Sequence, residues 1–129
     1  MPNSVRTILA VVTGFFIWAT VATILNFGVR WLMPDYVGVE KSMDFTLAMQ
    51  IARLMLGAAA SLAAGAACVL VGRGIKPSVY ILAALMLVLF VPMHIGLWDK
   101  FPVWYHLIFL GTLVPLVFVG ARWKFNPEK

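Results

Sequence analysis

Four long apolar segments alternate with short polar connections along the chain, at residues 7–29, 45–72, 78–97 and 103–121. A helix needs about 20 apolar residues to cross a hydrocarbon core of about 30 Å. Each segment reaches or approaches that length. We therefore predict an all-α polytopic membrane protein whose four helices run up, down, up and down. We expect residues 1–129 to form a single four-helix transmembrane domain.

The composition favours the same interpretation. Of all residues, 63% are hydrophobic and 12% are charged, whereas soluble domains carry about 25% charged residues. A soluble fold this apolar could not cover its surface with polar groups. We therefore expect membrane lipids to surround the protein.

The first apolar segment, residues 7–29, follows Arg6 and so starts as a secretory signal peptide would. It is longer than the apolar region of a signal peptide, which spans about 7–15 residues, and no convincing A-x-A cleavage motif follows it. We expect this segment to be a retained transmembrane helix.

Turn-forming residues mark the three connections. Residues 31–44 are rich in polar and turn residues, and Asp44 is a good N-cap candidate for the second helix. Pro77 marks the start of the third helix. Residues 98–101 form a short turn, and Pro102 follows at the start of the fourth helix.

Basic residues gather near the ends of the apolar segments, which predicts the orientation. Six Lys and Arg residues lie on the side of the termini and four lie on the opposite side. The first group is Arg6, Arg73, Lys76, Arg122, Lys124 and Lys129, and the second is Arg30, Lys41, Arg53 and Lys100. The positive-inside rule then predicts cytoplasmic termini, and we expect a multi-pass protein of the bacterial cytoplasmic (inner) membrane. The chain has no run of basic residues, so we expect no nucleic-acid partner.

Small residues recur along one face of the second segment. Gly57, Ser61 and Gly65 are spaced four residues apart, so they share a helix face. Small residues let helix backbones approach closely in lipid. We expect this stripe to pack inside the bundle, with a homodimer seam on the same face as the alternative.

Polar residues concentrate in the half of the spans that is predicted to face outward. His94 lies five residues before Asp99, and His106 lies seven residues after it. Because the turn between their helices is short, we expect the two histidines to face each other at equal depth, with Arg53 within reach. The same layer is expected to hold Asn26, Arg30, Trp98, Asp99, Trp104 and Tyr105.

Two interpretations of this polar layer remain open. Ionisable groups at membrane depth usually face the bundle interior or a water-filled cavity, which favours a ligand-binding pocket. Long basic side chains and aromatic residues also form an interfacial belt without any ligand. In a pocket, a desolvated Arg53 would keep a nearby imidazole neutral and would favour an acid such as Asp99 or Glu40 as its partner.

Cofactors are not the leading expectation. The segment HIGLWD, residues 94–99, is similar to segments of haem-bearing respiratory anchor subunits. That resemblance implies haem, and neutral imidazoles such as those of His94 and His106 can ligate its iron. A quinone or a lipid headgroup would instead use the His, Arg and Trp side chains together. Two histidines are too few for a closed zinc site, although Asp99 would supply a third ligand. The single cysteine, Cys68, excludes an intramolecular disulfide and a cysteine-only metal site.

No nucleophile with a base, phosphate-binding glycine loop or carboxylate pair is present, so we lean against an enzyme. The leading hypothesis is a non-enzymatic accessory or structural subunit, or a homo-oligomeric module, associated with itself or with a larger membrane complex. The first alternative is a ligand-binding or transport protein with an outward-facing pocket built on His94, His106 and Arg53. The second alternative is a haem- or quinone-binding redox subunit.

Overall fold

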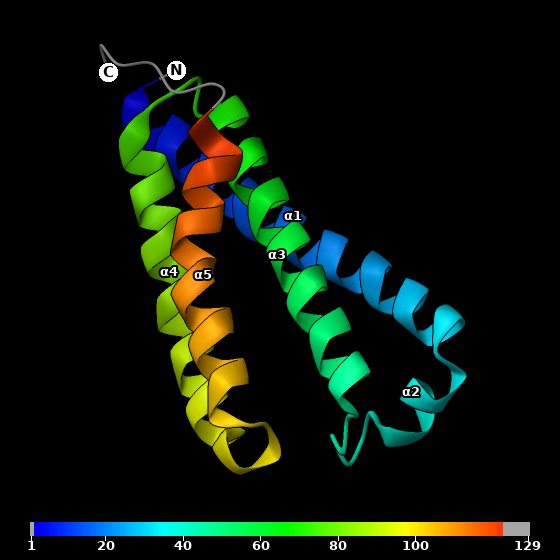
Figure 1. Ribbon diagram of the computed structural model, residues 1–129. Coiled ribbons are helices and arrows are strands. Elements are labelled where there is room, and N and C mark those ends of the chain that lie inside the picture. The colour runs from blue at the N-terminus through cyan, green and yellow to red at the C-terminus, as the bar shows by residue number, and fades with distance from the viewer. Residues whose placement is uncertain (1, 123–129) are drawn as a thin grey trace.

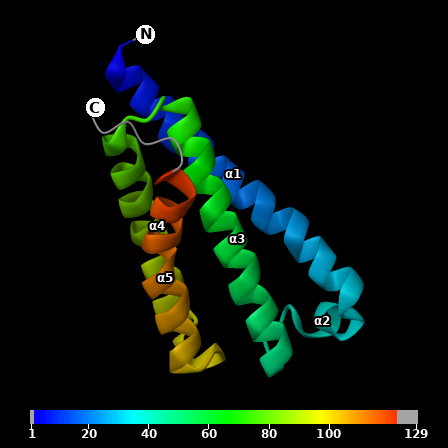
Figure 2. The ribbon, with the colours of Figure 1, turned by 45° about the horizontal axis from the view of Figure 1, so that its top comes forward.

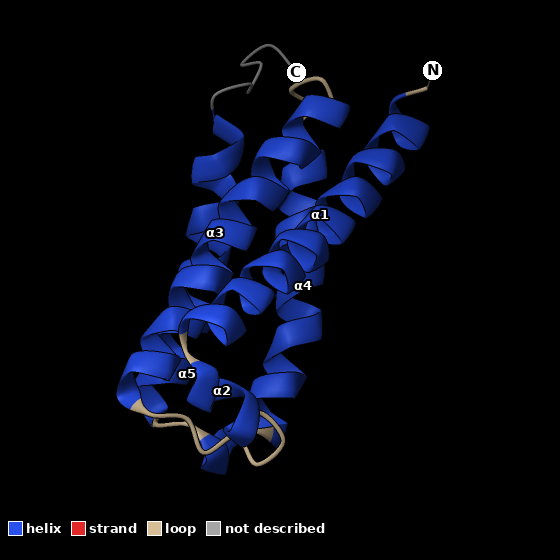
Figure 3. Cartoon of the chain, turned by 90° about the vertical axis from the view of Figure 1, so that its right-hand side faces the viewer, coloured by secondary structure: helices blue, strands red, loops and turns tan. Residues whose placement is uncertain are grey.

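In the computed structural model, which describes residues 2–122, the chain is built from helices and has no strand in that range (Figure 3). Four helices are long and apolar enough to cross a membrane, namely α1 (Asn3–Leu32), α3 (Leu47–Val71), α4 (Lys76–Gly96) and α5 (Val103–Ala121). The connections hold the short helix α2 (Pro34–Val39) and the 3-10 helix η1 (Trp98–Lys100). These findings confirm an all-helical chain and indicate a membrane protein.

The long helices converge at one end and spread apart at the other (Figures 1 and 2). Successive long helices run in opposite directions, and α3 packs against both α1 and α5. We call the end where α1 starts and α5 finishes, at Asn3 and Ala121, the closed end. The end that carries α2 and η1 is the open end. Lys124 and Lys129, which contribute to the predicted orientation, lie outside the described residues.

The boundaries differ from the prediction mainly around residues 31–44. Helix α1 continues to Leu32, and α2 occupies much of the stretch that was predicted to be a connection. Asp44 was predicted as the N-cap of the next helix, which is wrong. Thr46 is the cap, and its hydroxyl accepts a hydrogen bond from the backbone nitrogen of Met49 at 3.3 Å. The reason is that Phe45 turns inward, so the chain becomes helical only after it.

The third and fourth spans also begin close to their predicted positions. Helix α4 starts at Lys76, two residues before the predicted residue 78, because Pro77 fits within the first helical turn. It ends at Gly96, where residue 97 was predicted. Helix α5 covers residues 103–121, as predicted.

Helices α3 and α5 make a very close crossing in the half of the molecule near the closed end. A Cβ atom added at Gly65 would collide with the backbone oxygen of Val117, and one added at Gly120 would collide with that of Leu62. Each glycine therefore faces the backbone of the other helix. Close backbone approach matters in lipid, because lipid gives no hydrophobic drive for helices to associate.

The small-residue stripe of α3 faces the inside of the bundle. A Cβ atom at Gly57 would lie 2.8 Å from the Phe109 ring of α5. The Ser61 hydroxyl donates to the Gly57 carbonyl at 2.7 Å and accepts from the Trp18 indole N–H of α1 at 3.1 Å. Together with Gly65, these residues are covered by α1 and α5. The bundle thus occupies the face on which a homodimer seam was the alternative.

Candidate functional site

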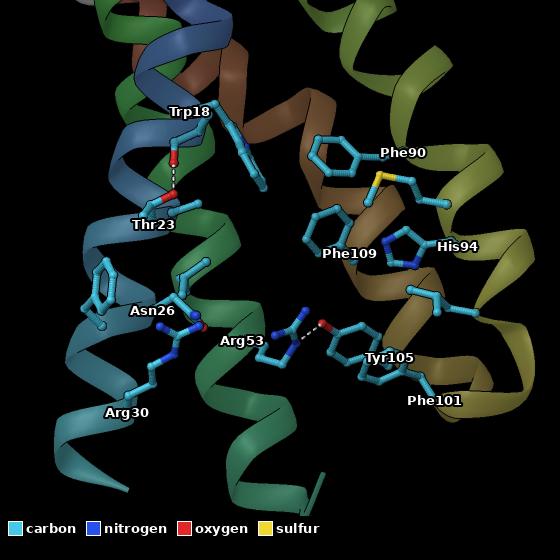
Figure 4. A pocket seen from close by; sticks show the side chains of 16 residues that line it. Trp18, Thr23, Asn26, Arg30, Arg53, Phe90, His94, Phe101, Tyr105 and Phe109 are labelled. Atoms are coloured by element: carbon cyan, nitrogen blue, oxygen red, sulfur yellow. Dashed lines mark hydrogen bonds between the residues drawn. The ribbon is translucent and has the colours of Figure 1, made fainter. Parts of the chain in front are cut away.

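A cavity of about 500 Å³ lies between α1, α3 and the α4–α5 hairpin, in the half of the molecule near the open end (Figure 4). Its polar wall residues are Thr23, Asn26, Arg30, Arg53, His94 and Tyr105. Its aromatic wall residues are Trp18, Phe27, Phe90, Phe101, Tyr105 and Phe109. Small-molecule sites typically measure about 300–1,000 Å³, so the size fits a small ligand.

At the open end, four stacked rings connect the α2–α3 region to the α4–α5 hairpin. We call these rings, which belong to Tyr36, Phe45, Phe101 and Tyr105, the aromatic stack. Successive ring centroids are 5.1, 5.8 and 4.3 Å apart, and the planes are within 25° of parallel. All four residues are buried. Tyr36 and Phe45 come from α2 and the segment before α3, and the other two come from the α4–α5 hairpin. The stack therefore bridges helices that otherwise spread apart here.

Arg53 extends from α3 against this stack. Its Nη1 donates to the Tyr36 hydroxyl at 2.6 Å, and its Nε donates to the Tyr105 hydroxyl at 3.4 Å. Its guanidinium carbon lies 4.8 Å from the centre of the Phe45 ring, a cation–π distance. All of these partners are uncharged. Figure 4 shows Arg53 at the cavity wall, opposite His94.

The expectation of an acidic partner for Arg53 is wrong. Glu40 instead pairs with Arg30, whose Nε and Nη2 donate to its two carboxylate oxygens at 2.6 and 2.8 Å. Helix α2 turns the chain back, so Glu40 lies beside the end of α1 rather than beside α3. This hydrogen bond from Arg30 lowers the pKa of Glu40 below its usual value. Asp99 is exposed in η1.

The charges around the cavity are therefore unbalanced. The positive charge of Arg30 is offset by a bidentate ion pair with Glu40. Within residues 2–122, Arg53 makes no ion pair with a carboxylate. The cavity wall thus carries one positive charge that no carboxylate of the described residues meets at ion-pair distance, and Glu40 interacts with it only at longer range.

His94 and His106 face each other between α4 and α5. Their Nδ1 atoms are 2.7 Å apart, and Nε2 of His106 lies 3.3 Å from the backbone oxygen of Trp98. The Trp98 ring stacks on the His106 ring at 4.6 Å between centroids. Their distances from a short turn had predicted this facing arrangement, and the hydrogen bond confirms it.

Only some of the predicted cluster reaches the cavity. His94, Asn26, Arg30, Arg53 and Tyr105 line it, whereas His106 is fully buried behind His94. The other predicted residues, Trp98, Asp99 and Trp104, are exposed and do not line it.

The histidine pair does not fit a metal held between the rings. A metal–nitrogen bond of about 2.0–2.1 Å on each side needs more room than the observed 2.7 Å between the Nδ1 atoms. Asp99 forms no group of three metal-ligating side chains with the histidines in the described region. Shared ligation of haem iron by His94 and His106 finds no support in this geometry.

Sequence reasoning missed Tyr36, Trp18 and Phe109. Tyr36 stands in a stretch full of turn residues, which predicted a solvated connection. Its one sequence signal was a second aromatic residue, Phe45, at the other end of the same connection, as expected if the connection folds back on the bundle. Trp18 and Phe109 lie in uniformly apolar spans, where the sequence does not separate a cavity-facing ring from a lipid-facing one.

No protein-family model, curated protein or solved structure matches the chain.

Proposed function

We propose that the protein binds a small amphipathic anion in this cavity, within one leaflet of a membrane. The observation that carries the proposal is Arg53, a cation on the cavity wall whose hydrogen-bond partners among residues 2–122 are two phenol hydroxyls. Ionisable residues within membrane spans are costly and usually serve a function. A guanidinium has five N–H donors, and the two tyrosines engage two of its nitrogens. The remaining donors are free for an anionic head.

The other end of the cavity suits an apolar tail. Trp18, Phe90 and Phe109 form a mutually packed group, with Trp18 and Phe90 ring centroids 4.7 Å apart. The Trp18 indole N–H already donates to Ser61, so this group offers the ligand mainly apolar surface. Arg53 and this aromatic group together favour a ligand with a charged head and a hydrocarbon tail.

The orientation is part of the same proposal. We propose cytoplasmic termini in a bacterial inner membrane, which places the open end on the outer side. The positive-inside distribution supports this placement. The ligand then enters from the outer leaflet. The expected accessory-subunit or homo-oligomer role remains a prediction, and native mass spectrometry of the purified protein tests it.

Equilibrium binding of radiolabelled dodecanoate to protein in phosphatidylcholine nanodiscs tests the site, with empty nanodiscs subtracted. Arg53→Gln should weaken binding by at least about tenfold, because a hydrogen bond to a charged group contributes about 1.5–3 kcal/mol and 1.4 kcal/mol is tenfold. Lys100→Gln is the matched control, since Lys100 is an exposed cation at the same end. The Lys100→Gln variant should bind dodecanoate with the affinity of the unmodified protein.

Two results would contradict the proposal. One is equal affinity in the Arg53→Gln variant and the unmodified protein. The other is equally tight, saturable binding of dodecyltrimethylammonium, a cation with the same tail, because an unbalanced positive charge should exclude it.

A further inference from the structure

His94 presents a ring nitrogen, Nε2, to the cavity, and no described residue forms a hydrogen bond with it. Its Nδ1 is engaged by His106, and no partner is found for its Nε2. The side chain is 92% buried, yet no sealed side-chain nitrogen or oxygen in residues 2–122 lacks a hydrogen-bond partner. Nε2 therefore lies at the cavity surface, and Figure 4 shows the His94 ring directed into the cavity from α4.

A backbone carbonyl determines which role this nitrogen plays. The Trp98 oxygen only accepts hydrogen bonds, so Nε2 of His106 carries the proton. With both rings neutral, Nδ1 of His106 is then an acceptor, and Nδ1–H of His94 donates to it. The remaining nitrogen of His94, Nε2, carries a lone pair. The His94–His106 pair thus presents a hydrogen-bond acceptor to the ligand.

The two polar groups on opposite sides of the cavity have opposite requirements. Arg53 only donates hydrogen bonds, whereas Nε2 of His94 accepts one. A simple carboxylate satisfies Arg53 and offers no hydrogen-bond donor to Nε2, whereas a hydroxyl on the same head would supply one. We infer that the site recognises an amphipathic anion whose head also carries a hydroxyl group, with that hydroxyl donating to Nε2 of His94. This inference rests on the proposed anion-binding function.

Two sources supply this head chemistry, namely a hydroxylated fatty acid and a glycerol-headed phosphodiester lipid. Matched pairs of probes separate them. Dodecanoate is compared with 2-hydroxy- and 3-hydroxydodecanoate, and dodecyl propyl phosphate, a phosphodiester without hydroxyl groups, is compared with dodecyl phosphoglycerol. The pair in which the added hydroxyl raises affinity identifies the source, and a gain in both pairs assigns recognition to the shared head chemistry.

The first measurement is ¹⁵N NMR of nanodisc-embedded protein labelled only at histidine, since the chain has two histidines. Before ligand is added, one ring should be protonated at Nδ1 and the other at Nε2. Loss of the first signal in His94→Phe assigns it to His94. A hydroxylated probe should shift the His94 Nε2 resonance, and its unhydroxylated partner should leave it in place.

The second measurement is affinity. The hydroxyl should strengthen binding by about 2- to 10-fold in the unmodified protein, as expected for one net hydrogen bond. In His94→Phe the hydroxylated and unhydroxylated anions should bind with equal affinity, so the gain from the hydroxyl is lost whatever the affinity of the unhydroxylated anion becomes. His94→Asn is a second, smaller replacement for use if His94→Phe does not fold. The NMR response to ligand is measured on the unmodified protein, and a variant is needed only to assign the signals.

The outcomes separate the inference from the proposed function. Arg53-dependent binding with no hydroxyl gain and no response at Nε2 overturns the inference and leaves anion binding intact. A His94 ring protonated at Nε2 in the ligand-free protein also overturns it. Absence of Arg53-dependent binding for every probe overturns both.

Discussion

At the scale of single residues, Tyr36 connects two polar side chains of the site, although the sequence did not single it out. Its hydroxyl donates to Oδ1 of Asn26 at 2.7 Å and accepts from Nη1 of Arg53 at 2.6 Å. The side chain is fully buried, and its ring stacks on Phe45. One residue of α2 thereby links α1 to α3 and holds the guanidinium at the cavity wall.

Tyr36→Phe should lower the free energy of unfolding by about 1–2 kcal/mol, because it removes a hydroxyl that bonds a charged group and an amide. It should also weaken dodecanoate binding several-fold, because Arg53 loses its shortest hydrogen bond. Tyr80→Phe is the control, since Tyr80 is 60% exposed and its hydroxyl forms no hydrogen bond with residues 2–122. Equilibrium unfolding in mixed micelles measures the stability of the two variants, and the nanodisc assay measures their dodecanoate binding. Equal effects of the two variants would show that the link has no energetic importance.

At the scale of elements, the close crossing of α3 and α5 depends on glycine. Gly65→Ala and Gly120→Ala should each reduce stability by about 1–3 kcal/mol, because the new Cβ meets a backbone oxygen that has no freedom to move aside. Gly57→Ala should cost less, because its Cβ meets the ring of Phe109, which is a movable side chain. Thermal unfolding measures these changes.

Gly111→Ala is the matched control for this series. It lies on α5 like Gly120, but nothing lies within 4 Å of an added Cβ. Alanine should be neutral or slightly stabilising there, because it favours a helix by about 0.5–1 kcal/mol relative to glycine. If Gly65→Ala and Gly120→Ala behave like Gly111→Ala, the two helices do not cross at these glycines.

At the scale of the whole molecule, the two ends are held together by different means. Glycine-mediated backbone contact joins α3 and α5 near the closed end. At the open end, the aromatic stack bridges helices whose backbones have separated. The cavity lies between these two attachments because bulky side chains there keep the helices apart. The shape of the molecule therefore follows from small residues at one end and large rings at the other.

The proposed orientation predicts which end is accessible from outside the cell. Cys68→Ala gives a cysteine-free background, since Cys68 is the single cysteine. In that background, Lys100→Cys at the open end should react with a membrane-impermeant maleimide on intact cells. Arg73→Cys, near the closed end, should react only after lysis. The reverse pattern would invert the orientation and place the cavity on the cytoplasmic side.

The sequence by itself determined the four spans, because apolar length and turn residues act locally and need no knowledge of the fold. It also predicted that His94 and His106 lie at equal depth, because a short turn sets their depth, whereas the rotation of α4 and α5 brings their rings together. Only the tertiary structure decided the partners of Arg53. Those partners depend on the path of α2, a helix of six residues in a polar stretch, and on how each long helix is rotated about its axis. In uniformly apolar spans the sequence gives little information on that rotation, since every face is compatible with lipid, and packing of the small residues and rings fixes it.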